Sequence, residues 1–285
     1  MKHLVLNNYR FHYEEKGNGD PLIFVHGSVS DYRTWSNQQE EIGRLYRTMA
    51  CSRRFHWPNV KISDHEDYSM IQHVEDLDAF ISATCDRPVH LIGHSYGAFV
   101  CLLLTGQYQD LVRTLVLAEP PVTTLFVSNS PRPSEILKLL FTRPKTAAAI
   151  IKFGARGIAP ATAEVKRGNL DKAIEIFGKV TLGSGAYESL SKERLEQVHE
   201  NLIKAEFLGS GYPPLDIERI RQISIPILLV YSQGSPRLFH LLQDRLHELL
   251  PHAGQQLITG AAHIMHEDNP DAYNKALLSL IDGQS

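Results

Sequence analysis

The stretch Gly93-His94-Ser95-Tyr96-Gly97 decides the fold, because it places the pattern Gly-x-Ser-x-Gly between an apolar strand and an apolar helix. Residues 88–92 (PVHLI) precede it and residues 98–104 (AFVCLLL) follow it. A serine on so sharp a turn adopts a strained backbone conformation, which lifts its hydroxyl clear of the sheet edge. The flanking glycines avoid collisions of Cβ atoms with the backbone. The helix turns its N–H groups and positive dipole end toward an oxyanion formed there. We therefore predict that Ser95 is a nucleophile.

Apolar runs alternate with helical patterns along the rest of the chain, which is typical of a parallel α/β sheet. We expect a hairpin over residues 3–6 and 9–14, and strands over 21–25, 46–51, 88–92, 114–118, 225–231 and 255–258. Helical patterns cover residues 74–83, 238–250 and 271–281. Between about Pro121 and Pro214 helical patterns separated by prolines replace the strands. We predict a core made of residues 1–120 and 214–285 and a helical cap made of residues 121–213. A helical packing layer without a lid function is the alternative.

Composition excludes several other classes of function. The 285 residues carry a formal net charge of −3, so there is no basic excess to attract nucleic acid or an anionic membrane. No apolar run approaches the roughly 20 residues that span a bilayer, and the N-terminus turns polar too early for a signal peptide. Three widely spaced cysteines fit free thiols in a cytoplasmic protein. Metal-ligand spacing and nucleotide-binding glycine motifs are absent, so we expect neither metal nor cofactor.

A base has to take the serine proton before the hydroxyl becomes a good nucleophile. His263 follows the last expected strand in residues 260–266 (GAAHIMH), from which its ring can swing back over the serine. His266 competes for this role, and we expect it to face solvent. His94 is expected to pack at the turn with its ring away from the pocket. We predict that His263 is the base.

A third group has to fix the imidazole tautomer and stabilise the imidazolium. Its usual position is the loop 232–237 (SQGSPR), which contains no carboxylate. Glu119 closes the strand 114–118 at its carboxyl end, where functional groups of such sheets gather. A charged residue at that position is costly unless it is paired. We predict that Glu119 is the acid, with a salt bridge to the cap as the alternative.

Two backbone N–H groups are needed to hold the oxyanion. We expect one from Tyr96, which follows the nucleophile, and one from Ser28 in the loop after the strand 21–25. Trp35 is a candidate for the pocket wall and equally for a core anchor.

The loop 52–59 (SRRFHWPN) carries bulky aromatic and basic residues. Arg53, Arg54 and His56 are predicted either to touch a polar substrate or to form a buried ion pair or rim.

These features together resemble the α/β-hydrolase superfamily. The matching segments span nearly the whole chain in the expected order: His26-Gly27, Gly93–Gly97, Leu117–Pro121, Ile225–Val230 and Gly260–His263. The resemblance implies a mostly parallel sheet of about eight strands with a helical cap after the sixth. An acid after the sixth strand is similar to haloalkane dehalogenases and fungal zearalenone lactonases. Dehalogenases and epoxide hydrolases of this fold use an aspartate nucleophile, which Ser95 argues against. The family's usual Asp-x-x-Gly-x-Gly-x-Ser loop is replaced here by residues 52–59.

The sequence thus predicts a serine esterase or lactonase that cleaves a small-molecule ester or lactone through an acyl-enzyme. The expected triad is Ser95, His263 and Glu119, in a monomer or homodimer. Cleavage of an amide or a carbon–carbon bond by the same triad is an alternative within the enzyme class. A non-catalytic ligand receptor on the hydrolase fold is a further alternative, against which the complete triad speaks.

Overall fold

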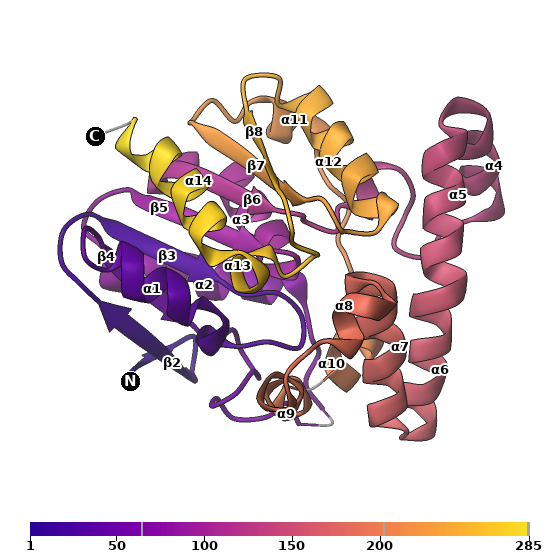
Figure 1. The fold of residues 1–285 in the computed structure, drawn as a ribbon, viewed down its shortest axis with the longest axis horizontal. Helices are drawn as coiled ribbons and strands as arrows, with labels where there is room; N and C mark the ends of the chain where they lie inside the picture. Colours follow the sequence, from indigo (N-terminus) through magenta and orange to yellow (C-terminus); the bar gives the residue numbers. More distant parts are fainter. Residues whose placement is uncertain (64, 202, 284–285) are drawn as a thin grey trace.

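An eight-stranded sheet forms the centre of the computed structural model, which describes residues 1–63, 65–201 and 203–283 (Figure 1). Its strands are β1 (Lys2–Leu6), β2 (Tyr9–Lys16), β3 (Pro21–Val25), β4 (Arg47–Cys51), β5 (Val89–His94), β6 (Val112–Ala118), β7 (Ile227–Ser232) and β8 (Gly254–Ile258). They lie in the order β1-β2-β4-β3-β5-β6-β7-β8. β2 is antiparallel to both of its neighbours, and all other pairs are parallel. The mostly parallel sheet of about eight strands predicted from the sequence is confirmed.

Helices cover both faces of this sheet. They are η1 (Tyr32–Trp35), α1 (Ser36–Ile42), α2 (Met70–Thr84), α3 (Tyr96–Gln107), η2 (Gln109–Leu111), α11 (Ile217–Arg221), α12 (Arg237–Leu249), α13 (Met265–Asp268) and α14 (Pro270–Asp282). Successive side chains of a strand point to opposite faces. Ile23 and Leu91 belong to a buried cluster that includes residues of α2, α3, α11 and α12, whereas Leu22 and Ile92 belong to one that includes residues of α1 and α14. Burial on both faces explains why the central strands read as continuous apolar runs.

The chain between β6 and β7 forms a separate group of helices beside the sheet (Figure 1). They are η3 (Thr123–Leu125), α4 (Pro133–Thr142), α5 (Pro144–Phe153), η4 (Gly154–Ile158), α6 (Ala159–Arg167), α7 (Leu170–Leu182), α8 (Ser184–Glu188), α9 (Lys192–Glu200) and α10 (Ile203–Leu208). The described residues of segment 121–213 include no strand. Asn201 ends α9. We call these helices the cap; its limits at residues 121 and 213 stay a prediction.

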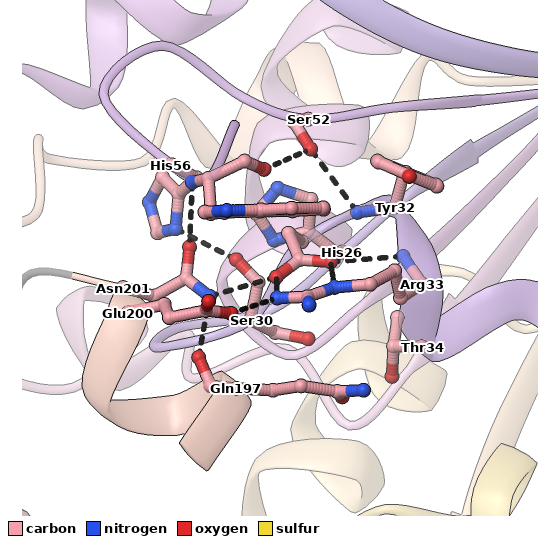
Figure 2. Close-up of polar contacts among 12 residues, drawn as sticks. His26, Ser30, Tyr32, Arg33, Thr34, Ser52, His56, Gln197, Glu200 and Asn201 are labelled. Carbon is pink, nitrogen blue, oxygen red and sulfur yellow. Dashed lines mark hydrogen bonds and ion pairs between the residues drawn. The ribbon is translucent and has the colours of Figure 1, made fainter. Parts of the chain in front are cut away.

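Polar side chains tie the end of α9 to the loop that follows β3 (Figure 2). Arg33 Nη2 donates to Asp31 Oδ2 at 2.7 Å and to Glu200 Oε2 at 2.6 Å. Asn201 Nδ2 donates to Asp31 Oδ2 at 2.9 Å, and Asn201 Oδ1 accepts from the Trp57 backbone N–H at 2.9 Å. The cap is thereby held against the loops at the carboxyl edge of the sheet. In the described part of the chain, no helix has both the length and the apolar character to cross a bilayer.

Candidate active site

Ser95 lies on the turn between β5 and α3, with φ of 50° and ψ of −120°. The turn is tight because a Cβ on Gly93 would lie 2.5 Å from Ala98 Cα, and one on Gly97 would lie 2.3 Å from Val25 O. Glycine is therefore required at both positions. A strained backbone of this kind persists only where the surroundings hold it. The geometry agrees with the nucleophile turn that the sequence predicts.

The structure brings His263 to this serine. Its Nε2 lies 3.0 Å from Ser95 Oγ, within hydrogen-bond reach for a nucleophile and its base. The imidazole is buried and stacks on Phe239, with ring centroids 4.1 Å apart. The His263 backbone is held as well, because His94 Nε2 donates to the His263 carbonyl at 2.8 Å. His263 is thus held at both its ring and its backbone.

Glu119 lies on the far side of the imidazole from Ser95. Its Oε2 accepts from His263 Nδ1 at 2.6 Å, and the residue is 1% exposed. The contact fixes the proton on Nδ1, which leaves Nε2 free to accept the proton of Ser95. Glu119 has a left-handed φ of 47°, which turns it out of β6 toward the imidazole. The carboxylate thus bonds His263 rather than forming the salt bridge to the cap that was the alternative.

The loop that usually carries the acid supplies hydrogen-bond donors to Glu119 instead. The backbone N–H of Ser232 donates to Oε1 at 2.9 Å, and Ser235 Oγ donates to Oε2 at 2.6 Å. The two serine hydroxyls lie 2.7 Å apart. These donors satisfy a buried carboxylate that would otherwise be costly in a dry site. Sequence analysis did not identify them, although two hydroxyl residues in an acid-less loop are a usable signal.

Two further histidines, His94 and His266, are buried close to His263. Burial, together with the neighbouring His266 and His263, holds the pKa of His94 well below its usual range, so its ring is neutral. His266 is fully buried, contrary to the expectation that it faces solvent. Its Nε2 bonds Thr34 Oγ1 at 2.8 Å, and burial lowers its pKa to about 4. Its ring stacks on Trp35, which is why it turns inward.

Backbone groups suited to hold an oxyanion flank the serine. Tyr96 is the first residue of α3, and the first N–H groups of a helix have no acceptor within the helix. The loop after β3 approaches from the other side, because a Cβ on Gly27 would lie 3.1 Å from Ser95 Cβ. Ser28 and Ser95 line one cavity. Assignment of the Tyr96 and Ser28 N–H groups to the oxyanion hole stays a prediction.

The cavity above Ser95 has a volume of about 70 Å³ and lies between core and cap. Its cap side is mostly apolar and comes from α7 and α9 and the residues between them: Ile174, Phe177, Thr181, Leu182, Tyr187, Leu190 and Val198. Arg194 is the charged residue of the lining, and its Nε donates to Glu267 Oε2 at 2.9 Å. The sequence alone does not tell which apolar cap residues face the cavity and which face the core, because that depends on the rotation of α7.

The four residues proposed as substrate contacts lie outside this lining. Trp35 is fully buried between Phe24 and His266, which makes it a core anchor. Arg54 forms a buried ion pair with Asp76, at 2.7 Å.

His56 and Arg53 contact residues 26–30 of the loop that follows β3. We call these residues the oxyanion loop because they include the predicted Ser28 donor. His56 Nδ1 donates to the Ser30 carbonyl at 2.8 Å (Figure 2). Arg53 is buried and pairs with Glu206 of α10. The sequence left two roles open for these basic side chains, contact with a polar substrate and a buried ion pair or rim. Their positions support the second role.

Within the described residues, no cluster of three or more histidine, cysteine, aspartate or glutamate side chains is arranged to hold a metal ion.

Comparison with known proteins agrees with this architecture. The model of the Alpha/beta hydrolase family matches residues 22–276. The chain therefore belongs to the alpha/beta hydrolase family, and the resemblance drawn from the sequence is confirmed. A thermophilic esterase from Thermogutta terrifontis has the same fold, with a TM-score of 0.74 at 16% identity over 99% of this chain and 98% of that one.

Two curated relatives are epoxide hydrolases by name. "Epoxide hydrolase 2" of Caenorhabditis elegans is 32% identical over 122 residues, which are 42% of this chain and 34% of that protein. The match thus covers about a third of that relative's length. "Epoxide hydrolase 3" of Xenopus tropicalis is 23% identical over 291 residues, covering 95% of this chain and 74% of the relative.

Proposed function

We propose that this protein is a serine hydrolase that cleaves a carboxylic ester or lactone through an acyl-enzyme. The observation that carries the proposal is the continuous line from Ser95 Oγ through His263 to Glu119, with contacts of 3.0 and 2.6 Å. A hydroxyl, an imidazole and a carboxylate in this order are the parts of a nucleophilic triad. All three are nearly inaccessible to solvent, which strengthens their electrostatic interactions.

The proposed reaction has two halves. Ser95 Oγ attacks the substrate carbonyl while its proton passes to His263 Nε2, and the resulting oxyanion accepts hydrogen bonds from the Tyr96 and Ser28 N–H groups. The tetrahedral intermediate collapses, the C–O bond to the leaving group breaks, and His263 gives its proton to the departing alkoxide oxygen. A water then attacks the acyl-enzyme with His263 as base, and the acid is released as Ser95 regains its proton.

The nucleophile also argues against epoxide opening, although two of the matched relatives are epoxide hydrolases by name. A serine oxygen that attacked an epoxide carbon would form an ether. Water does not attack an ether carbon under these conditions, so the enzyme would be trapped after one turnover. A carboxylate nucleophile avoids this because it forms an ester. An acyl substrate is the class for which Ser95 gives a hydrolysable intermediate.

The cavity favours a short apolar acyl group. Its volume of about 70 Å³ is smaller than the roughly 150 Å³ that accommodates a benzene molecule in an engineered protein cavity. Burial of each CH₂ group of a substrate against the apolar cap side contributes about 0.8 kcal/mol. We expect a chain of a few carbons, or a small lactone ring, to fit without movement of the cap.

A panel of p-nitrophenyl esters of increasing chain length, small lactones, an anilide and a 1,3-diketone tests the proposal, with Ser95→Ala as the control. The proposal expects turnover of short esters or lactones that is lost in Ser95→Ala. Cleavage of only the 1,3-diketone or the anilide favours the carbon–carbon or amide alternative. A folded protein that binds these compounds and turns over none of them favours the receptor alternative.

A further inference from the structure

The guanidinium of Arg53 lies directly behind the peptide that carries the predicted Ser28 donor. Arg53 Nη2 donates to the Gly27 carbonyl at 2.9 Å, and Arg53 Nε donates to the His26 carbonyl at 3.1 Å. The side chain is 5% exposed, so these contacts are made in a dry environment. A buried guanidinium has a large desolvation cost, and its donors need to be satisfied. In this protein two of them are directed at consecutive carbonyls of the oxyanion loop.

A second donor fixes the same carbonyl. The Arg53 backbone N–H donates to His26 Nε2 at 2.9 Å, so the His26 proton resides on Nδ1. That Nδ1 donates to the Gly27 carbonyl at 2.8 Å. Burial, followed by the charge of Arg53, holds the pKa of His26 well below its usual range, which keeps this tautomer neutral. The Gly27 oxygen therefore accepts two hydrogen bonds, one from the Arg53 guanidinium and one from His26, whose tautomer the Arg53 backbone N–H fixes.

The direction of the Gly27 carbonyl sets the direction of the next N–H. The Gly27 oxygen and the Ser28 N–H belong to one planar trans peptide, so they point in opposite directions. With the oxygen held toward Arg53, the N–H is directed to the opposite side of the peptide. Gly27 approaches Ser95 so closely that a Cβ on it would lie 3.1 Å from Ser95 Cβ. An oxyanion formed at Ser95 needs a donor of fixed direction at this place.

The same guanidinium contacts the other half of the predicted hole and the cap. Its central carbon lies 4.4 Å from the centroid of the Tyr96 ring, a cation–π distance. Glu206 of α10 accepts from Arg53 Nη2 at 3.1 Å and from Tyr68 Oη at 2.7 Å. Although burial raises it, the neighbouring His56 and the charge of Arg53 lower the pKa of Glu206 to about 2. Glu206 is thus a charged anchor that the cap provides.

We propose that Arg53 is a positioning residue of the oxyanion hole and that Glu206 anchors it from the cap. Arg53 does not touch the reacting atoms; it orients the peptide whose N–H does. This inference rests on the proposed serine hydrolase function. It also explains why the loop after β4 carries a large cation: the guanidinium reaches from that loop to the oxyanion peptide. The cap and the hole are consequently coupled through one buried ion pair.

The adjacent ion pair provides a matched control. Arg54 and Asp76 are joined by two contacts of 2.7 Å, and both side chains are 5% exposed, compared with 5% and 6% for Arg53 and Glu206. Arg54 makes none of the hydrogen bonds to residues 26–28 that Arg53 makes. Arg53→Lys and Arg54→Lys each keep a positive charge while removing the planar fork of donors. Glu206→Gln and Asp76→Asn form the second matched pair.

Two readouts separate positioning from general loss of structure. One is the rate at which a p-nitrophenyl phosphonate modifies Ser95, because its phosphoryl oxygen enters the hole as an ester's oxyanion does. The other is the affinity for a trifluoromethyl ketone, which forms a tetrahedral adduct, relative to the matching methyl ketone. Loss of one oxyanion donor costs roughly 100- to 1000-fold in rate. For Arg53→Lys we expect about a 100-fold slower modification, a matching loss of trifluoromethyl ketone affinity and unchanged methyl ketone affinity.

We expect Glu206→Gln to slow the modification about 10-fold, and Arg54→Lys and Asp76→Asn to remain within about threefold of the parent. With a short ester as substrate, Arg53→Lys is expected to lower kcat and leave KM within about threefold. Equal effects of Arg53→Lys and Arg54→Lys, or a change in KM alone, would overturn the positioning role. Absence of both ester turnover and phosphonate modification in the parent protein would instead overturn the proposed function on which it rests.

Discussion

Glu119→Gln tests the unusual acid, because the surroundings of the carboxylate determine which way the new amide turns. Its Oε1 faces the backbone N–H of Ser232 at 2.9 Å, a donor that cannot become an acceptor. The amide NH₂ is therefore expected at the Oε2 position, facing His263 Nδ1 and Ser235 Oγ. The imidazole then carries its proton on Nε2, which points at Ser95 and no longer accepts its proton.

The expected cost is large and confined to the chemical step. A tautomer switch of this kind lowers kcat about 10⁴-fold in a Ser-His-Asp protease, which corresponds to about 5 kcal/mol of transition-state stabilisation. We expect a comparable fall in kcat for a short p-nitrophenyl ester, with thermal unfolding little changed because glutamine has the same shape. Asp268→Asn is the control. Asp268 accepts from the Ala262 backbone N–H at 2.8 Å, beside the same loop, and we expect less than a tenfold effect. A fall of less than tenfold in Glu119→Gln, or an equal fall in both variants, refutes the assignment.

Three further predictions address the acid's position, the cavity and the buried histidines. Because Ser235 Oγ lies 2.6 Å from Glu119 Oε2, we expect Ser235→Asp to restore part of the kcat lost in Glu119→Ala, by more than tenfold; no recovery in the folded double variant would contradict this. Replacement of Phe177, which lines the cavity, by leucine should shift the preferred ester toward longer acyl chains, measured as kcat/KM across the chain-length series; an unchanged order would show that this wall does not limit the substrate. Burial lowers the pKa values of His90 and His266 to about 4. Between pH 6.5 and pH 5.5 the unfolded chain therefore binds more protons than the folded one, and the free energy of unfolding should fall by at least about 2 kcal/mol as pH falls. Urea unfolding at the two pH values measures this, and equal stability would contradict it.

Sequence reasoning predicted the sheet and the three side chains of the proposed triad because each is marked by a local pattern. The apolar runs over 21–25, 88–92 and 114–118 lie within or close to β3, β5 and β6, since strands buried on both faces admit few polar residues. Ser95 is marked by its glycines and Glu119 by its position as a charge at the end of a buried strand. The roles of these residues remain proposals that the experiments above test.

Contacts between segments that are distant in the sequence could not be predicted from local patterns. Trp35 and His266 stack on each other in the core, and neither orientation is encoded in the local pattern. Arg53 pairs with Glu206 of α10, which lies 153 positions later in the sequence. The sequence could therefore not decide between substrate contact and a buried ion pair for Arg53. The apolar residues of α7 divide between cavity and core according to the rotation of that helix, which depends on how the whole cap packs.

The most direct measurement is mass spectrometry of the protein after reaction with a fluorophosphonate, in the parent, Ser95→Ala and His263→Ala. We predict one covalent adduct per chain, located on the peptide that contains Ser95, absent from Ser95→Ala and formed at least 1000-fold more slowly in His263→Ala, in line with the roughly 10⁴-fold cost of disabling a triad base. An unmodified Ser95 in the folded protein, or ester hydrolysis that survives in Ser95→Ala, would contradict the claim that the hydroxyl and the imidazole work as one nucleophile.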